Sequence, residues 1–221
     1  MPFVISFFVA ELIFFAAFII FSGFNYKKRF ETKYNPKNMF PYEINYESRF
    51  SENMIGNICF VLFLTLHLGV FVLQMNYFLN ERLVFNLVTS ILYVVTSALV
   101  FFVPLRLLKT HLICSTILIG ASFLNFASLG YTAFDFYNLF NKEAPFIVLT
   151  IIGFVVAIFY FGVVMNPKLT SWAKVDKVEQ NGKTIYQRPK IFVLAFSEWL
   201  SIYGLPVASL LGTLTYIFIS K

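Results

Sequence analysis

The chain has 221 residues, of which 59% are hydrophobic and 20% aromatic but only 13% charged, and its mean hydropathy is +0.77. Soluble domains carry about 25% charged residues, so this composition excludes a soluble globular protein and predicts an integral membrane protein. The formal net charge of +6 is better explained by basic loops beside membrane spans than by nucleic-acid binding.

Six hydrophobic stretches are long enough to cross a bilayer, because a helical span needs about 20 apolar residues. The predicted spans are residues 3–24, 54–78, 83–103, 112–133, 146–165 and 191–219. We therefore expect an all-α fold, a polytopic integral membrane protein whose six-transmembrane-helix bundle forms a single domain over residues 1–221. The first stretch is too long for the apolar core of a cleaved signal peptide and has no basic residue before it, so we expect it to remain as a span.

Lys and Arg are distributed unevenly over the segments between these spans. Residues 25–53, 104–111 and 166–190 hold all but three of the 17, the exceptions being Arg82, Lys142 and Lys221. Basic loops stay in the cytoplasm, so we expect these three segments to be cytoplasmic and both termini to lie outside, in the plasma (cell) membrane. The bias towards Phe, Ile, Asn and Lys indicates an AT-rich genome, and we expect a bacterial source.

The first long loop carries aromatic residues at helical spacing among its basic residues. They are Tyr26, Phe30 and Tyr34 before Asn35-Pro36, and Tyr42, Tyr46 and Phe50 after Pro41. This pattern predicts two short amphipathic interfacial helices, with the rings in the headgroup layer and the basic side chains against anionic lipid headgroups. A basic, aromatic segment can also bind nucleic acid, but a position between two spans favours membrane lipids as the partner, and we expect no nucleic acid.

The second long loop has the pattern of a small cytoplasmic β-hairpin. Two runs of alternating side chains, residues 175–180 and 183–187, flank Asn181-Gly182, which suits the positive φ angles of a type I′ turn. A lone hairpin is marginally stable in water, so we expect it to pack on the first loop or on a membrane or cytoplasmic protein. The expected partner-docking residues are Asn181, Gly182, Lys183 and Tyr186.

Three ionisable side chains lie deep within the predicted spans. Glu11 and His67 belong to antiparallel neighbours and are both expected near the middle of the bilayer. A low dielectric disfavours a charged carboxyl, so we expect Glu11 and His67 to form a hydrogen-bonded or ion pair. Gln74 lies on nearly the same face as His67 and would extend this polar cluster outward. Glu198 is closer to the cytoplasmic side, and its contact with Glu11 would need a helix shift or a bridging water.

Other features of the spans have plainer interpretations. Gly204 and Pro206 predict a kink in the last span, which is either a static bend or the broken helix of a transport site. Stripes of serine and small residues on the third, fourth and sixth spans predict close helix packing, while the fifth span is expected to face lipid. Cys59 and Cys114 are expected as free, buried thiols, and His111 as a boundary residue in contact with phospholipid.

The sequence carries no HExxH, GxSxG or P-loop motif, so we expect no enzyme activity, no cofactor and no metal site. Two functions remain. One is a non-catalytic membrane protein that acts through protein partners, as an accessory, regulatory or immunity-type protein. The other is a small proton- or cation-coupled transporter that uses Glu11, His67 and Glu198. Intramembrane acids are as consistent with polar pins that fix packing as with a functional site, and the absence of a visible transporter repeat favours the first function.

Overall fold

The computed structural model describes residues 2–45, 50–75, 80–140, 143–169, 176–180 and 183–220. Within these residues six helices are long and apolar enough to cross a membrane, which confirms the predicted helical, multi-pass membrane fold. They are α1 (Pro2–Phe30), α2 (Met54–Met75), α3 (Asn80–Phe102), α4 (Leu108–Leu139), α5 (Ala144–Val164) and α6 (Val193–Ile219). Each overlaps its predicted span, but α4 begins at Leu108 rather than at Leu112, a difference that matters for the site.

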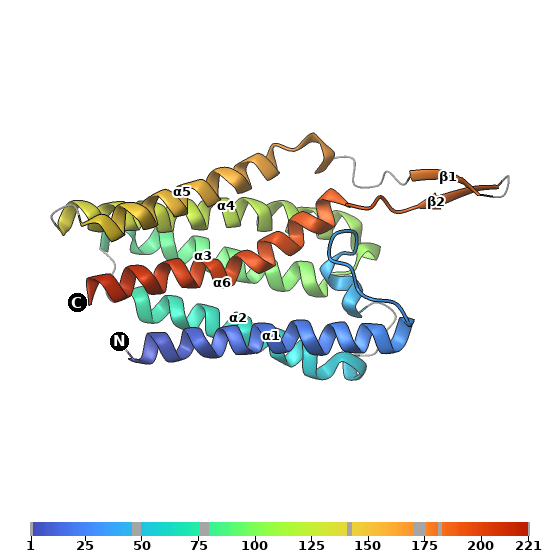
Figure 1. Ribbon diagram of the computed structural model, residues 1–221, viewed down its shortest axis with the longest axis horizontal. Coiled ribbons are helices and arrows are strands. Elements are labelled where there is room, and N and C mark those ends of the chain that lie inside the picture. Colours follow the sequence, from blue (N-terminus) through green and yellow to red (C-terminus); the bar gives the residue numbers. More distant parts are fainter. Residues whose placement is uncertain are drawn as a thin grey trace.

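The helices lie side by side in one bundle, with the start of α1 and the end of α6 at the same end (Figure 1). At the opposite end α1 finishes and α6 begins. We call this opposite end the basic end, because Lys27, Lys28 and Arg29 occupy the last turn of α1 there.

The helices differ in how much of their surface the bundle covers. The share of the membrane-spanning window that is buried is 61% for α6 and 56% for α4, but 28% for α5 and 17% for α1. α1 buries a single stripe, in which Val4, Glu11, Phe18, Ser22 and Tyr26 recur at seven- and four-residue spacing. The rest of the membrane-spanning window of α1 and much of α5 present apolar side chains to the outside of the bundle.

Two glycines allow α4 and α5 to approach closely. A Cβ added at Gly153 of α5 would lie 2.6 Å from the Cα of Gly130 and 2.8 Å from its backbone nitrogen in α4. No side chain fits between two backbones at this separation. Small residues commonly have this role in membrane bundles, where close backbone packing replaces the hydrophobic effect.

Phenylalanine rings fill the interior between α1, α2 and α3. The ring centroid of Phe60 lies 4.2 Å from that of Phe101 and 4.7 Å from that of Phe18. All three side chains are fully buried. Such tilted contacts let rings from α1, α2 and α3 pack tightly, because the edge of one ring meets the face of the next.

The first long loop differs from its prediction. α1 continues through Phe30, and the chain then reverses at Glu31, whose φ of 56° lies in the left-handed region. We call residues 31–45 the strap; it is irregular except for three-residue-per-turn helix η1 (Pro41–Asn45). The first expected amphipathic helix is therefore wrong as a separate element, because residues 26–30 continue α1 and the chain then leaves the helix. Residues 46–49 of the second expected helix lie outside the described residues. The expectation that the rings lie in the headgroup layer is wrong for Tyr26 and Tyr42, which are buried against the bundle.

The remaining described elements are short. Single helical turns lie at η2 (Phe50–Asn53), η3 (Leu105–Leu107) and η4 (Pro167–Leu169). Strands β1 (Asp176–Gln180) and β2 (Lys183–Gln187) pair antiparallel, with Gln180 opposite Lys183 and Lys177 opposite Tyr186. They extend beyond the basic end (Figure 1). The predicted turn residues Asn181 and Gly182 lie outside the described residues.

Candidate functional site: two buried acid–histidine pairs

Glu11 of α1 and His67 of α2 form the first buried pair. Nδ1 of His67 lies 3.0 Å from Oε1 of Glu11, and the two residues are 3% and 0% exposed. The structure thus brings together the two residues that depth matching had paired. Ser209 of α6 adds a third helix, because its Oγ lies 2.9 Å from the same Nδ1.

The geometry of this pair does not fit the acid–histidine–serine triad of a serine hydrolase. In an acid–histidine–serine triad the carboxylate binds one ring nitrogen and the serine faces the other. Here Glu11 and Ser209 both face Nδ1 of His67, so the ring cannot pass a proton from the serine to the acid through its two nitrogens. A nitrogen that carries one proton or one lone pair serves one partner well at a time. Glu11 and Ser209 can therefore alternate as the hydrogen-bond partner of Nδ1 of His67.

Glu198 of α6 and His111 of α4 form the second buried pair. Nε2 of His111 lies 3.1 Å from Oε1 of Glu198, and both residues are 0% exposed. The prediction that His111 contacts phospholipid is therefore wrong. α4 starts one turn earlier than expected, and the strap covers His111 with the edges of Phe40 and Tyr42, whose ring centroids lie 5.5 and 5.4 Å away.

The sequence contained a signal for His111. The polar stripe on the fourth span, which includes Ser115, Ser122 and Asn125, reaches His111 if it is extended by one helical turn towards the basic end. The Lys109 neighbour and the late predicted boundary concealed it. Ser115 itself completes the site, since its Oγ lies 2.6 Å from Oε1 of Glu198 and 2.8 Å from the carbonyl oxygen of His111.

Hydrogen bonding fixes where the protons of His111 can lie. Nδ1 lies 2.8 Å from the carbonyl oxygen of Val103, which only accepts, so Nδ1 carries a proton. Nε2 and Oε1 of Glu198 then share the next proton. The pair is either a neutral carboxylic acid donating to imidazole or an imidazolium donating to carboxylate. Its total charge is zero in both forms, which suits a low-dielectric interior.

Each acid has one oxygen with no hydrogen-bond partner among the residues that the structure describes. These atoms are Oε2 of Glu11 and Oε2 of Glu198, and within the same residues the buried Oγ of Ser201, which lies between the pairs on α6, also has none. About three turns of α6, roughly 16 Å, separate Glu198 from Ser209. The two acids therefore belong to separate pairs joined by one helix, and they make no direct contact with each other.

Gln74 does not extend the Glu11–His67 pair in the predicted way. Its Nε2 donates to Oγ1 of Thr213 on α6 at 3.0 Å. Gly212 leaves the room for this side chain, because a Cβ there would lie 2.3 Å from Oε1 of Gln74. Gln74 does line the same small void as His67, Ser90 and Asn125, with a volume of about 10 Å³. That volume is at the lower limit for one water molecule.

The segment around Gly204 and Pro206 is a helix with no break. α6 runs continuously from Val193 to Ile219 with Pro206 inside it. The hydroxyl of Tyr160 donates to the carbonyl of Leu200 at 2.7 Å, and that of Tyr93 donates to the carbonyl of Ser201. A Cβ at Gly204 would lie 2.4 Å from both hydroxyl oxygens. Gly204 thus makes room for two tyrosines from α3 and α5, which bond to the α6 backbone.

The strap is fastened over the Glu198–His111 pair. Arg188 donates two hydrogen bonds of 2.7 Å to the Glu43 carboxylate, which also accepts from the backbone nitrogen of Phe40 at 2.8 Å. The Glu43 hydrogen bonds raise the pKa of Arg188 above its ordinary value. The indole nitrogen of Trp199 donates to the hydroxyl of Tyr34 at 2.8 Å. These bonds keep the pair covered at the basic end.

Comparisons with protein-family models, with curated proteins and with solved structures found no match to this chain. Its own residues therefore carry the functional argument. Among the described residues, no three His, Cys, Asp or Glu side chains gather to hold a metal ion. Cys59 and Cys114 are free and buried, as expected.

Proposed function

We propose that this protein moves protons through its bundle, as a small proton-coupled membrane transport protein. The observation that carries the proposal is the Glu198–His111 pair, in which the Val103 carbonyl fixes one imidazole proton and a carboxyl and a ring nitrogen share the next. Such a pair can accept a proton from one side and release it to another without a net buried charge at rest.

Each carboxyl group has a second oxygen at which a proton could be exchanged. Among the described residues, neither Oε2 of Glu11 nor Oε2 of Glu198 has a hydrogen-bond partner. A relay needs such an oxygen, because a proton can enter or leave the carboxyl group there while Oε1 stays bonded to the histidine.

The size of the void favours a proton over a larger ion. The space beside His67 and Ser209 is about 10 Å³, too small for a hydrated cation and at the limit for one water. Polar groups also lie along α6 between the pairs, namely the hydroxyls of Ser201, Tyr93 and Tyr160. Proton transfer needs only hydroxyls and single waters at hydrogen-bond spacing, whereas cation transport needs a wider path.

The experiment is proton flux in proteoliposomes under an imposed pH gradient. The wild-type protein should exceed empty liposomes, and Glu11→Gln should remove the excess, because an amide cannot exchange a proton with His67. Thr150→Val is the matched control, since Thr150 is buried and donates only to its own helix at the Phe146 carbonyl. Wild-type flux at the level of empty liposomes would overturn the proposal.

We also propose an orientation and a location for the bundle. The excess of Lys and Arg in residues 25–53, 104–111 and 166–190 supports a cytoplasmic basic end. Both termini would then lie outside, in the cell membrane of a bacterium. Cysteine labelling from outside at residue 2 and at residue 37, one at a time in a background without Cys59 and Cys114, tests this; labelling of residue 37 alone would reverse the orientation.

A second candidate function is an accessory, regulatory or immunity-type protein that acts through a protein partner at the basic end. The observation that favours it is the β1–β2 ladder, which extends beyond the helices (Figure 1) although an isolated two-stranded ladder is marginally stable in water. Replacing Asn181-Gly182 by Ala-Ala tests it: a partner role requires loss of function and loss of cross-linking through Lys183, with proton flux unchanged.

A further inference from the structure

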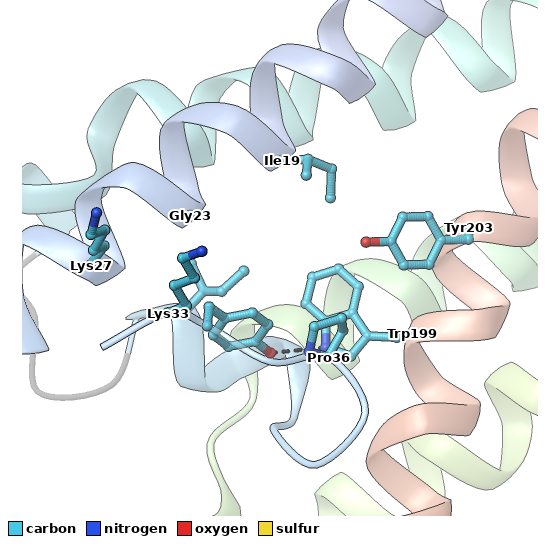
Figure 2. Close-up of a pocket in the computed structure, with 9 residues that line it drawn as sticks. Ile19, Gly23, Lys27, Lys33, Pro36, Trp199 and Tyr203 are labelled. Carbon is cyan, nitrogen blue, oxygen red and sulfur yellow. Dashed lines mark hydrogen bonds between the residues drawn. The ribbon is translucent and has the colours of Figure 1, made fainter. Parts of the chain in front are cut away.

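A cavity of about 260 Å³ opens between α1 and the start of α6 at the basic end (Figure 2). Its inner wall is apolar and aromatic, formed by Ile19, Ile44, Trp199 and Tyr203. Two ammonium groups stand at its rim, those of Lys27 in the last turn of α1 and Lys33 in the strap. None of the described residues that line the cavity carries a carboxylate.

The cavity has an amphipathic gradient that runs along α1. Lys27 and Ile19 are about two turns apart, roughly 12 Å along the helix, so the charged rim lies at the basic end and the apolar wall lies deeper. The hydroxyl of Tyr203 points into the space from α6 (Figure 2). The phenol is only partly covered, packed edge-on against Phe15 with centroids 5.5 Å apart and beside Trp199 at 5.7 Å.

Gly23 keeps this cavity open on the α1 side. It is one of the lining residues, and a Cβ built there meets no atom of the described residues within 4 Å. Glycine costs a helix about 1 kcal/mol relative to alanine, and no neighbouring atom at this position requires it. An open face on α1 between the lysine and the isoleucine is what an entering chain of methylene groups would need.

We propose that this cavity binds one anionic glycerophospholipid. The phosphate lies between the ammonium groups of Lys27 and Lys33, and the Tyr203 hydroxyl donates to an ester carbonyl. The upper part of one acyl chain packs on Ile19 and on the exposed ring of Tyr203, beside the buried Trp199. Pockets that enclose a whole ligand measure about 300–1,000 Å³, so a cavity of this size takes part of a lipid while the rest stays in the bilayer. This binding does not depend on the proton pathway.

Trp199 provides the probe, because it lines the cavity and the chain has only one other tryptophan. In a Trp172→Phe background, its fluorescence would be measured in phosphatidylcholine bilayers that contain increasing fractions of a dibromo-acyl lipid, whose bromines quench at short range. We expect half-maximal quenching at a several-fold lower fraction of dibromo phosphatidylglycerol than of dibromo phosphatidylcholine.

Two sets of variants identify the site. Lys27→Ala with Lys33→Ala should make the two lipids quench equally, whereas Lys28→Ala with Lys37→Ala, an equal loss of charge outside the cavity, should preserve the difference. Gly23→Phe should reduce quenching by both lipids, since it fills the open face. Equal quenching by both lipids in the parent protein would overturn the proposal, and so would relief of quenching by inorganic phosphate, which would show an anion site that needs no acyl chain.

Discussion

Nε2 of His111 lies 3.1 Å from Oε1 of Glu198, while Nδ1 of the same ring lies 2.8 Å from the carbonyl oxygen of Val103. A loop carbonyl and an acid in the second turn of α6 therefore fix the protonation of an imidazole in the first turn of α4. Because the strap covers this ring, the pair is held inside the protein at a depth where a free histidine would otherwise meet the headgroups.

The Glu198–His111 contact predicts strong energetic coupling. Glu198→Ala and His111→Ala should each lower the free energy of unfolding by about 2 kcal/mol, because each leaves a buried polar partner unpaired. The double variant should lose little more than either single one, with a coupling of about 1–2 kcal/mol, the upper end for polar pairs in membrane proteins. Thermal or denaturant unfolding in detergent measures this, and additive losses would show that the two side chains do not interact.

The shared nitrogen of His67 predicts an order among its neighbours. Ser209→Ala should cost no more than about 1 kcal/mol, since Glu11 keeps its bond to Nδ1 and gains the whole of it. His67→Ala should cost more than Ser209→Ala, because it leaves both Glu11 and Ser209 without this partner. The same unfolding assay ranks them. A Ser209→Ala loss as large as that of His67→Ala would mean that the serine, rather than the acid, is the main partner of the ring.

The tyrosines around Gly204 predict a steric test. Gly204→Ala would place a methyl group 2.4 Å from both tyrosine hydroxyls, so it should destabilise the bundle by about 1–3 kcal/mol, as overpacking does. Gly120→Ala is the matched control: nothing lies within 4 Å of its added Cβ, and the helix should become slightly more stable. Adding Tyr93→Phe and Tyr160→Phe to Gly204→Ala should recover part of the loss. A Gly204→Ala protein as stable as Gly120→Ala would contradict the close approach.

Tyr34 gives the strap a pH dependence. Burial raises the pKa of Tyr34 well above its ordinary value of about 10, while its hydroxyl donates to the Phe40 carbonyl at 2.7 Å. The raised pKa means that Tyr34 keeps its proton to a higher pH when the strap is packed on the bundle than when the strap is released. The stabilisation is therefore complete below about pH 10 and is lost progressively as the pH rises above it.

The measurement is Trp199 fluorescence in the Trp172→Phe background between about pH 8 and about pH 12. Tyr34→Phe should lose stability less steeply with pH above about 10 than the parent does, because one ionisable group fewer favours the released strap. Tyr93 and Tyr160 are present in both proteins and contribute equally, so the comparison isolates Tyr34. Identical slopes would contradict the assignment.

The sequence predicted what depends on local pattern and depth. Hydropathy and length located all six helices, since crossing a bilayer imposes a run of apolar residues that no tertiary contact can hide. Counting residues from the span ends paired Glu11 with His67, because helices packed antiparallel bring equal depths together. The helix positions need no knowledge of which helix faces which, and the pairing needs only the assumption that consecutive spans are neighbours.

Features that depend on the strap were not predictable in this way. Tyr26, Tyr34 and Tyr42 recur at a spacing that suits a helix on the membrane surface, and the pattern alone cannot distinguish rings in headgroups from rings packed on the bundle. His111 lies beside Lys109 at a helix boundary, so its burial depends on residues 31–45 covering it. The tyrosine bonds to the α6 backbone were likewise hidden, because they join residues 40 and 108 positions apart.

The proposed function depends most on whether the Glu198–His111 pair transfers protons, and proton flux with Glu198→Gln tests this most directly. Glutamine preserves the size of the side chain and can still bond to His111 and Ser115, but it cannot take up or release a proton at neutral pH. In proteoliposomes under an imposed pH gradient, we predict flux for the wild type and for Thr150→Val, and none above empty liposomes for Glu198→Gln. Glu198→Gln flux equal to that of the wild type would contradict the proposed pathway and leave the pair with a structural role.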